Sequence, residues 1–331
     1  MTTYNYNSEL VKAMNEKLPN GTNLANTLID ILYLGKEAVY RRLRGEVPFT
    51  LAEAAAISRK MGVSLDKLAE TNVSSNAIFD LNIVRQTDPL ETYYSIVDNY
   101  VKIFRDLNHD PSSKLCSASN IIPQTFYLKY ELLSKFRMFK WMYQFEKIDI
   151  EKHFEDMEIE DKFLEKQREF VRESQKFPYT EYIWDNKLFI YLINDIRYFA
   201  SIHLISQEYV QKLKRELLQL LHELEEIATR GIFKTGQEVF IYISNINFEA
   251  TYSYMASSAY HISLVRVFAI NSFATRDEQV FNSMKEWIYS LKKFSTLISV
   301  LNSLKHNGKS LKVCVFRLVL FLKMYFHFCF D

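Results

Sequence analysis

Hydrophobic positions follow helical spacing through most of the chain. In successive windows the apolar residues recur every three or four positions, which places them on one face of a helix. These windows cover residues 8–18, 23–33, 36–44, 50–61, 90–109, 124–147, 185–204, 206–231 and 275–298. The pattern therefore predicts a mainly α fold.

Three windows near the C-terminus alternate between apolar and polar residues, as half-buried strands do. They cover residues 239–244, 248–256 and 260–270. We expect a small α+β region here, suited to sensing or partner contact. Within it, Tyr252 and Tyr254 either line a pocket or pack in a core.

Breaks in the pattern divide the chain into four parts. Ser74-Ser75-Asn76 and Asp88-Pro89 interrupt the helical spacing after the first run of short helices. The predicted parts are an N-terminal domain, a helical middle region, a long helix with the α+β region, and a basic and apolar tail. Their bounds are 1–72, 73–205, 206–299 and 300–331.

The helix predicted over residues 206–229 has the most regular apolar spacing. Its stripe alternates steps of three and four, which is heptad spacing, and comprises Val210, Leu213, Leu217, Leu220, Leu224 and Ile227. Leu218 and Leu221 widen the stripe beyond a two-stranded seam. The helix either packs on its own domain or forms a dimer.

The N-terminal domain combines short apolar helices with clear helix boundaries. Thr50 and Glu53 form a capping box at the start of one helix, and Gly62 stands where a left-handed C-terminal cap is expected. Ser64 then begins a short fifth helix. In the helix before Gly45, Val39 supplies the buried face and the outward positions carry several basic residues.

That outward face has the chemistry of a DNA-reading helix. A helix fits the major groove, arginine bonds guanine O6 and N7 together, and lysine contacts phosphates. The alternative is a basic surface that is exposed to solvent and has no binding role. The outward positions are Gly35, Lys36, Glu37, Tyr40, Arg41 and Arg44. Arg42 lies toward the flank, where it contacts DNA backbone or a domain neighbour.

Residues 8–70 resemble the lambda-repressor-like, Cro-type helix-turn-helix domain. The matching features are apolar positions before the third helix, Val39 at its centre, Arg44-Gly45 at its end and the 62–66 stretch before the last helix. The apolar positions are Leu28, Leu32 and Leu34. The segment also resembles bacterial regulators with long C-terminal regions. The family's turn glycine falls at Tyr33 and its usual Ser or Thr cap at Gly35.

The resemblance implies that the six outward residues, Gly35 to Arg44, face DNA. It assigns Arg41 and Arg44 to base or phosphate contacts, and Lys36 and Tyr40 to phosphates. These readers commonly act as dimers on two half-sites.

Net charge is +1, and its distribution is uneven. Residues 300–331 hold five Lys or Arg against one Asp, a net of +4, so the remainder carries 36 basic against 39 acidic residues, or −3. A weakly acidic body excludes a broadly basic nucleic-acid coat. Three cysteines without a CxxC pair, and a polar N-terminus, predict a cytoplasmic protein.

No enzyme, cofactor or metal site is predicted. The sequence contains no GxGxxG, Walker, GxSxG or HExxH motif. His222 and Glu226 share a helix face without a third ligand near in sequence.

The tail differs from the rest of the chain in its pattern of apolar and basic residues. Residues 312–330 are apolar, but Lys312, Arg317 and Lys323 interrupt them, and a charge near the centre of a membrane span is costly. We expect no membrane span. A frameshifted terminus, a buried helix and a membrane anchor are the three alternatives.

Together these patterns predict a sequence-specific DNA-binding transcriptional regulator. The expected partners are double-stranded DNA, a second copy of the chain, and an effector that is a small molecule or a protein. The alternative function is a protein-interaction scaffold whose helix-turn-helix does not bind DNA.

Overall fold

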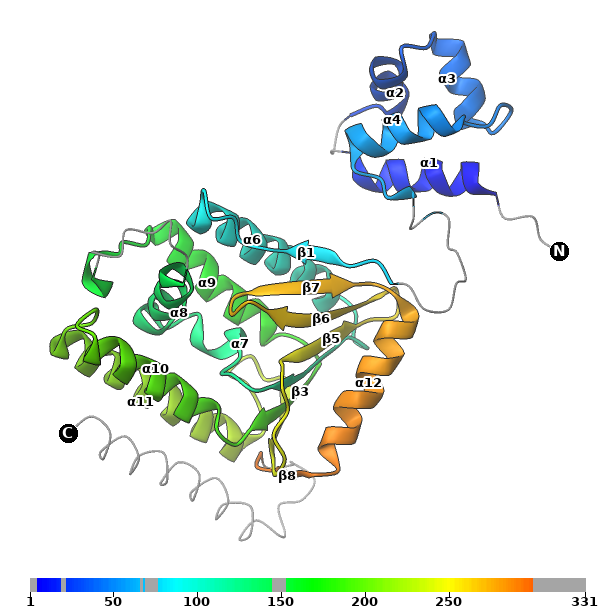
Figure 1. Cartoon of the computed structure of the whole chain (residues 1–331). Coiled ribbons are helices and arrows are strands. Elements are labelled where there is room, and N and C mark those ends of the chain that lie inside the picture. The colour runs from blue at the N-terminus through cyan, green and yellow to red at the C-terminus, as the bar shows by residue number, and fades with distance from the viewer. Residues whose placement is uncertain (1–4, 19–21, 66–67, 69–76, 145–152, 300–331) are drawn as a thin grey trace. The chain divides into compact units, whose positions relative to one another are not determined.

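The computed structural model describes residues 5–18, 22–65, 68, 77–144 and 153–299. The chain forms two compact units, Met1–Ile78 and Phe79–Asp331. Figure 1 labels the helices and strands of both.

The first unit is a bundle of short helices. Those described are α1 (Tyr6–Lys17), α2 (Leu24–Leu32), α3 (Lys36–Leu43) and α4 (Leu51–Met61). All four were predicted, to within two residues at most boundaries. The fifth helix predicted after Ser64 falls largely outside the described residues. The small core of the unit is formed by Leu10, Met14, Ala25, Leu28, Val39, Ile57 and Val63.

Local hydrogen bonds fix the boundaries of these helices. Thr50 Oγ1 accepts from the Glu53 amide at 3.3 Å, and Glu53 Oε2 accepts from the Thr50 amide at 2.8 Å. The capping box is thus confirmed. Gly62 ends α4 with φ 69°, which confirms the left-handed cap. Asn7 in α1 donates to the Arg42 carbonyl at 3.1 Å and accepts from the Phe49 amide at 2.9 Å.

The second unit is built on one mixed eight-stranded sheet, counted over the described residues. The strand order is β1-β7-β6-β5-β2-β3-β4-β8. Strands β2, β3 and β4 are parallel, and the other pairings are antiparallel. The strands are β1 (Asp80–Asn82), β2 (Lys114–Ser119), β3 (Tyr179–Asp185), β4 (Glu238–Ser244), β5 (Tyr252–Ala256), β6 (His261–Val267), β7 (Asn271–Thr275) and β8 (Ser295–Leu297).

Helices cover both faces of this sheet (Figure 1). One face carries α6 (Pro89–Asn108), α7 (Gln124–Tyr127), α8 (Glu131–Tyr143), a 3-10 turn η1 (Phe154–Asp156), α9 (Asp161–Ser174), α10 (Leu188–Ser201) and α11 (Gln207–Arg230). The other face carries α12 (Glu278–Lys292). Side chains of successive strand residues face opposite faces of the sheet. Leu115 and Tyr182 join the larger core, and Cys116 and Ile183 join the core beneath α12.

The prediction of a mainly α fold with a small α+β end is wrong. The second unit is an α+β structure whose sheet begins at Asp80 and includes β2 and β3. Strands β2 and β3 are buried on both faces apart from their first residues, so they show no alternation of apolar and polar positions. The three strands that were predicted correspond to β4, β5 and β6. The last helix ends at Lys292 rather than near residue 298, because β8 follows it.

The regular stripe of α11 packs within its own unit. All six of its apolar positions, from Val210 to Ile227, belong to the larger core. That face is therefore occupied and offers no seam to a second copy. The tail over residues 300–331 lies outside the described residues. In the described part of the chain, no helix is long and apolar enough to cross a bilayer.

The cap at Gly62 gives a test of the first unit. We expect Gly62→Ala to lower the free energy of unfolding of this unit by about 1 kcal/mol, because a Cβ disfavours left-handed backbone. Hydrogen exchange of the α4 amides in the full chain would measure the change. Gly62→Asn is the control, since Asn tolerates this conformation, and an equal loss in both variants would contradict the explanation.

Candidate nucleic-acid interface

A short turn connects α2 to α3. Three residues, Tyr33 to Gly35, separate the two helices. Tyr33 is left-handed, with φ 54° and ψ 36°, and its amide donates to the Ile29 carbonyl at 2.9 Å. In the Cro-type domain that this segment resembles, glycine occupies this position. The turn therefore forms with tyrosine at a backbone cost on the order of 1 kcal/mol.

The start of α3 is open. Gly35 occupies the N-cap position with φ −64° and ψ 151°, and no side chain bonds to the first amides of the helix. The first amides of a helix have no intrahelical partner. Such a terminus favours an anionic group.

The predicted DNA-facing residues lie on one outward surface. Gly35, Lys36, Glu37, Arg41 and Arg44 are exposed. Tyr40 is half-buried and packs against the small core, with the Lys36 ammonium 6.0 Å from its ring centre. Tyr33 adds an aromatic side chain beside this surface and is 91% exposed. Its exposure could not be read from the apolar spacing.

Two glutamates hold the exposed arginines. Arg44 bonds Glu46 at 2.6 Å and Glu37 at 3.1 Å, and Arg41 approaches Glu46 at 3.4 Å. The hydrogen bond from Arg44 is the main cause that lowers the pKa of the Glu46 carboxyl. Ion pairs this exposed contribute about 0–1 kcal/mol, so they exchange readily for other partners. With Lys36 the surface holds three cations against two anions, a net of +1.

Arg42 has a different environment from its neighbours. Its Nε and Nη2 atoms bond the two carboxylate oxygens of Glu53 at 3.0 and 2.8 Å, and its Nη1 bonds the Ala38 carbonyl at 3.1 Å. Both side chains are largely shielded from solvent. Arg42 therefore contacts a domain neighbour and joins α3 to α4. Glu53 serves both the capping box and this pair, a second role that the motif alone does not reveal.

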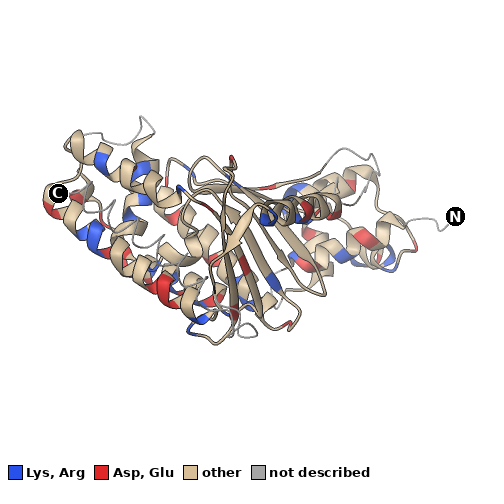
Figure 2. Cartoon of the chain, turned by 90° about the horizontal axis from the view of Figure 1, so that it is seen from below, with Lys and Arg blue, Asp and Glu red and all other residues tan. Residues whose placement is uncertain are grey.

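Charge elsewhere is mixed rather than concentrated. Lys and Arg are interspersed with Asp and Glu along the helices (Figure 2). Among the described residues no group of three or more His, Cys, Asp or Glu is arranged to hold a metal ion. His222 is exposed on α11, 3.5 Å from Glu226.

The Arg42–Glu53 pair predicts a measurable coupling. We expect a double-mutant cycle of Arg42→Ala and Glu53→Gln to give an interaction energy of about 1–2 kcal/mol, because the pair is bidentate and shielded. Gln retains the capping box. Burial raises the pKa of the Glu53 carboxyl, but hydrogen bonds from Arg42 and Thr50 lower it by more, so its net pKa is depressed.

A depressed pKa stabilises the fold above the ordinary value and loses that contribution as the pH falls. The protection factors of the α3 and α4 amides in the wild type, which correct hydrogen exchange for its intrinsic rate at each pH, should therefore fall below about pH 4.5. The Glu53→Gln variant should lack this component. A coupling near zero would show that the pair does not join the helices.

Comparisons with known proteins were made at three levels. No protein-family model matches the chain, and no curated protein and no solved structure matches it.

Proposed function

We propose that the chain is a sequence-specific DNA-binding transcriptional regulator that reads DNA with α3. The observation that carries this proposal is the α2–turn–α3 arrangement, with Arg41 and Arg44 exposed on α3 and at its C-terminal end. A short helix presented in this way fits the major groove, and arginine is the commonest reader of guanine.

Each residue of the surface has a role in this proposal. Arg41 and Arg44 contact base edges or phosphates, Lys36 and Tyr40 contact phosphates, and Gly35 lets a phosphate approach the open start of α3. Tyr33 holds a costly backbone conformation while its side chain lies in solvent, away from the core. Such strain is a pointer to contact function, and we assign Tyr33 to the DNA backbone.

Glu46 and Glu37 act against binding in this mechanism. Each must release Arg44 before that side chain reaches DNA, and each then lies near phosphates of like charge. The exchange costs little because the pairs are exposed. Non-specific binding makes few contacts to offset the loss of these ion pairs, whereas binding to a correct site makes many. The glutamates therefore weaken non-specific binding more than specific binding.

The proposal also includes the partners expected from the sequence. The regulator binds double-stranded DNA as a homodimer, and an effector acts on it, with the second unit as the effector-binding and contact region. The alternative is a scaffold, and the near-neutral charge of the α3 surface is the observation in its favour.

Selection from a random duplex library with the full chain, followed by binding at several salt concentrations, tests the proposal. We expect a discrete site. For that site, Arg41→Ala with Arg44→Ala should reduce affinity at least about tenfold and lower the salt slope by up to about 1.8, at 0.9 per lost phosphate contact. Glu46→Gln should instead raise affinity severalfold, because it frees Arg44 and removes a like charge.

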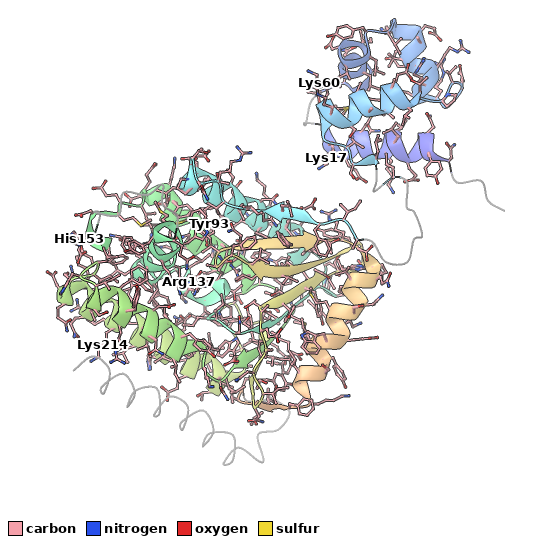
Figure 3. The ribbon with its side chains drawn as sticks, viewed as in Figure 1. Lys17, Lys60, Tyr93, Arg137, His153 and Lys214 are labelled. Atoms are coloured by element: carbon pink, nitrogen blue, oxygen red, sulfur yellow. The ribbon has the colours of Figure 1, made fainter. Side chains whose placement is uncertain are left out.

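A charge-matched control is Lys17→Ala with Lys60→Ala. Figure 3 labels these lysines at the ends of α1 and α4, on the opposite side of the unit from α3 in that view. This control should bind within about threefold of the wild type. If no sequence is enriched, and all variants bind equally at low salt, the scaffold function replaces the regulator.

A further inference from the structure

A cavity lies between α6 and the sheet of the second unit. Residues of α6, α7 and α9 line it from one side, and residues of β2, β5, β6 and β7 line it from the other. The space open to the centres of water molecules is about 80 Å³. One water needs roughly 10–15 Å³ on this measure, so the cavity has room for a small ligand.

The strand register gives the cavity a polar and an apolar end. Three successive rows of neighbouring strand residues line it: Leu115 with Met255, then Ser117, Ser253 and Leu264, then Thr251, Arg266 and Ser272. Polarity rises along these rows from hydrocarbon, through hydroxyls, to a guanidinium. The residues of α6 follow the same order, since Tyr100 contacts Ser272 and Phe104 packs on Phe177 just before β3.

The polar end is a connected set of hydrogen-bonding groups. Arg266 Nη2 donates to Gln124 Oε1 at 2.5 Å, and Nη1 donates to the Ile270 carbonyl at 3.3 Å. Gln124 Nε2 donates to the Tyr93 hydroxyl at 2.7 Å. A guanidinium has five N–H groups, so three of those on Arg266 have no protein partner among the described residues.

Arg266 also has no carboxylate partner among the described residues. Burial lowers the pKa of its guanidinium, and the charged or titratable groups that affect this pKa most are Tyr127, Tyr93 and Arg137 rather than an acid. Arginine nevertheless stays protonated in proteins. Its positive charge is thus held inside the protein, while part of its surface remains accessible.

Three half-buried lysines of this unit have carboxylate partners, whereas Arg266 has none among the described residues. Lys292 bonds Glu181, Lys129 bonds Glu223 and Lys140 bonds Asp195. A buried charge without a partner is costly, and an anion from solution would offset the cost. Arg266 therefore has the environment of a ligand-binding residue rather than of a structural ion pair.

We propose that this cavity binds a small organic monocarboxylate, with the carboxylate on Arg266 and the hydrocarbon body toward Leu115, Met255 and Phe104. One arginine and several neutral hydroxyls match a single negative charge. A phosphate dianion would leave an excess of negative charge in a buried site. Arg137 is not among the residues that line this cavity; it lies over the Tyr127 ring and lines a neighbouring cavity with Lys140 and Asp195.

The carboxylate head has two kinds of donor available. The free N–H groups of Arg266 offer a fork that matches a carboxylate, and the hydroxyls of Tyr100 and Ser272, 3.3 Å apart, lie at the same end. This inference goes beyond DNA binding and does not rest on it, because it concerns residues of the second unit alone.

Calorimetric titration of the full chain tests the proposal. The probes are butanoate, hexanoate, octanoate, benzoate and phenylacetate, each beside its neutral amide, with inorganic phosphate as a further anion. We expect at least one acid to bind at least about tenfold more tightly than its amide, because the charge-assisted bonds to Arg266 are lost in the amide.

Two variants locate the site. Arg266→Met should abolish the preference for acids and should unfold at the same or a higher temperature without ligand, because it removes an unpaired buried charge. Tyr100→Phe should weaken acid binding severalfold and leave folding intact. Arg276→Met is the matched control, since Arg276 is exposed and stacks on Tyr260 outside the cavity.

Three results would overturn the proposal. They are the failure of every acid to bind, equal affinity for acids and amides, and tighter binding of phosphate than of any acid. Retained acid preference in Arg266→Met, or unchanged acid affinity in Tyr100→Phe if the first variant does not fold, would also place the ligand elsewhere.

Discussion

Burial of the parallel strands on both faces is the constraint on which the second unit depends. Parallel neighbours cannot be joined by tight turns, so the chain must leave the sheet and return through helices. The connections from β2 to β3 and from β3 to β4 supply α7 to α11, which cover one face. The opposite face would then remain exposed, and α12 covers it. Ile183 at the centre of β3 is fully shielded as a result.

The same constraint creates the cavity. The crossover helices cover the parallel part of the sheet, whereas α6, which precedes β2, covers the antiparallel part. A single helix and the short α7 do not fill this side completely. Strand residues that face it include serines, a threonine and an arginine beside Leu115, Met255 and Leu264.

The sequence predicted elements whose signals are local, such as helices and their caps. It could not predict elements that depend on contacts between residues far apart in the chain. Helices of the first unit follow from their apolar spacing and caps, and β4 to β6 follow from alternation on half-exposed faces. Strand β2 is buried on both faces and has the sequence KLCSAS, which carries neither signal. Exposure of Arg41 and Arg44 followed from helical geometry. Their pairing with Glu46 required the conformation of the loop after α3. No motif marks Arg266, whose neighbours Gln124 and Tyr93 are more than 140 residues away.

Arginine serves three physical purposes in this chain, and the partner of each guanidinium distinguishes them. Arg42 is shielded and bidentate with Glu53, so removing either member leaves an unpaired group between helices, and its role is structural. Arg41 and Arg44 are exposed and paired with glutamates that water can replace, so they can change partners at little cost. Arg266 is half-buried and has no carboxylate partner among the described residues, so a bound anion would offset the cost of its partly desolvated charge. Because desolvation strengthens each later interaction, the site with the weakest internal pairing has the most to gain from a ligand.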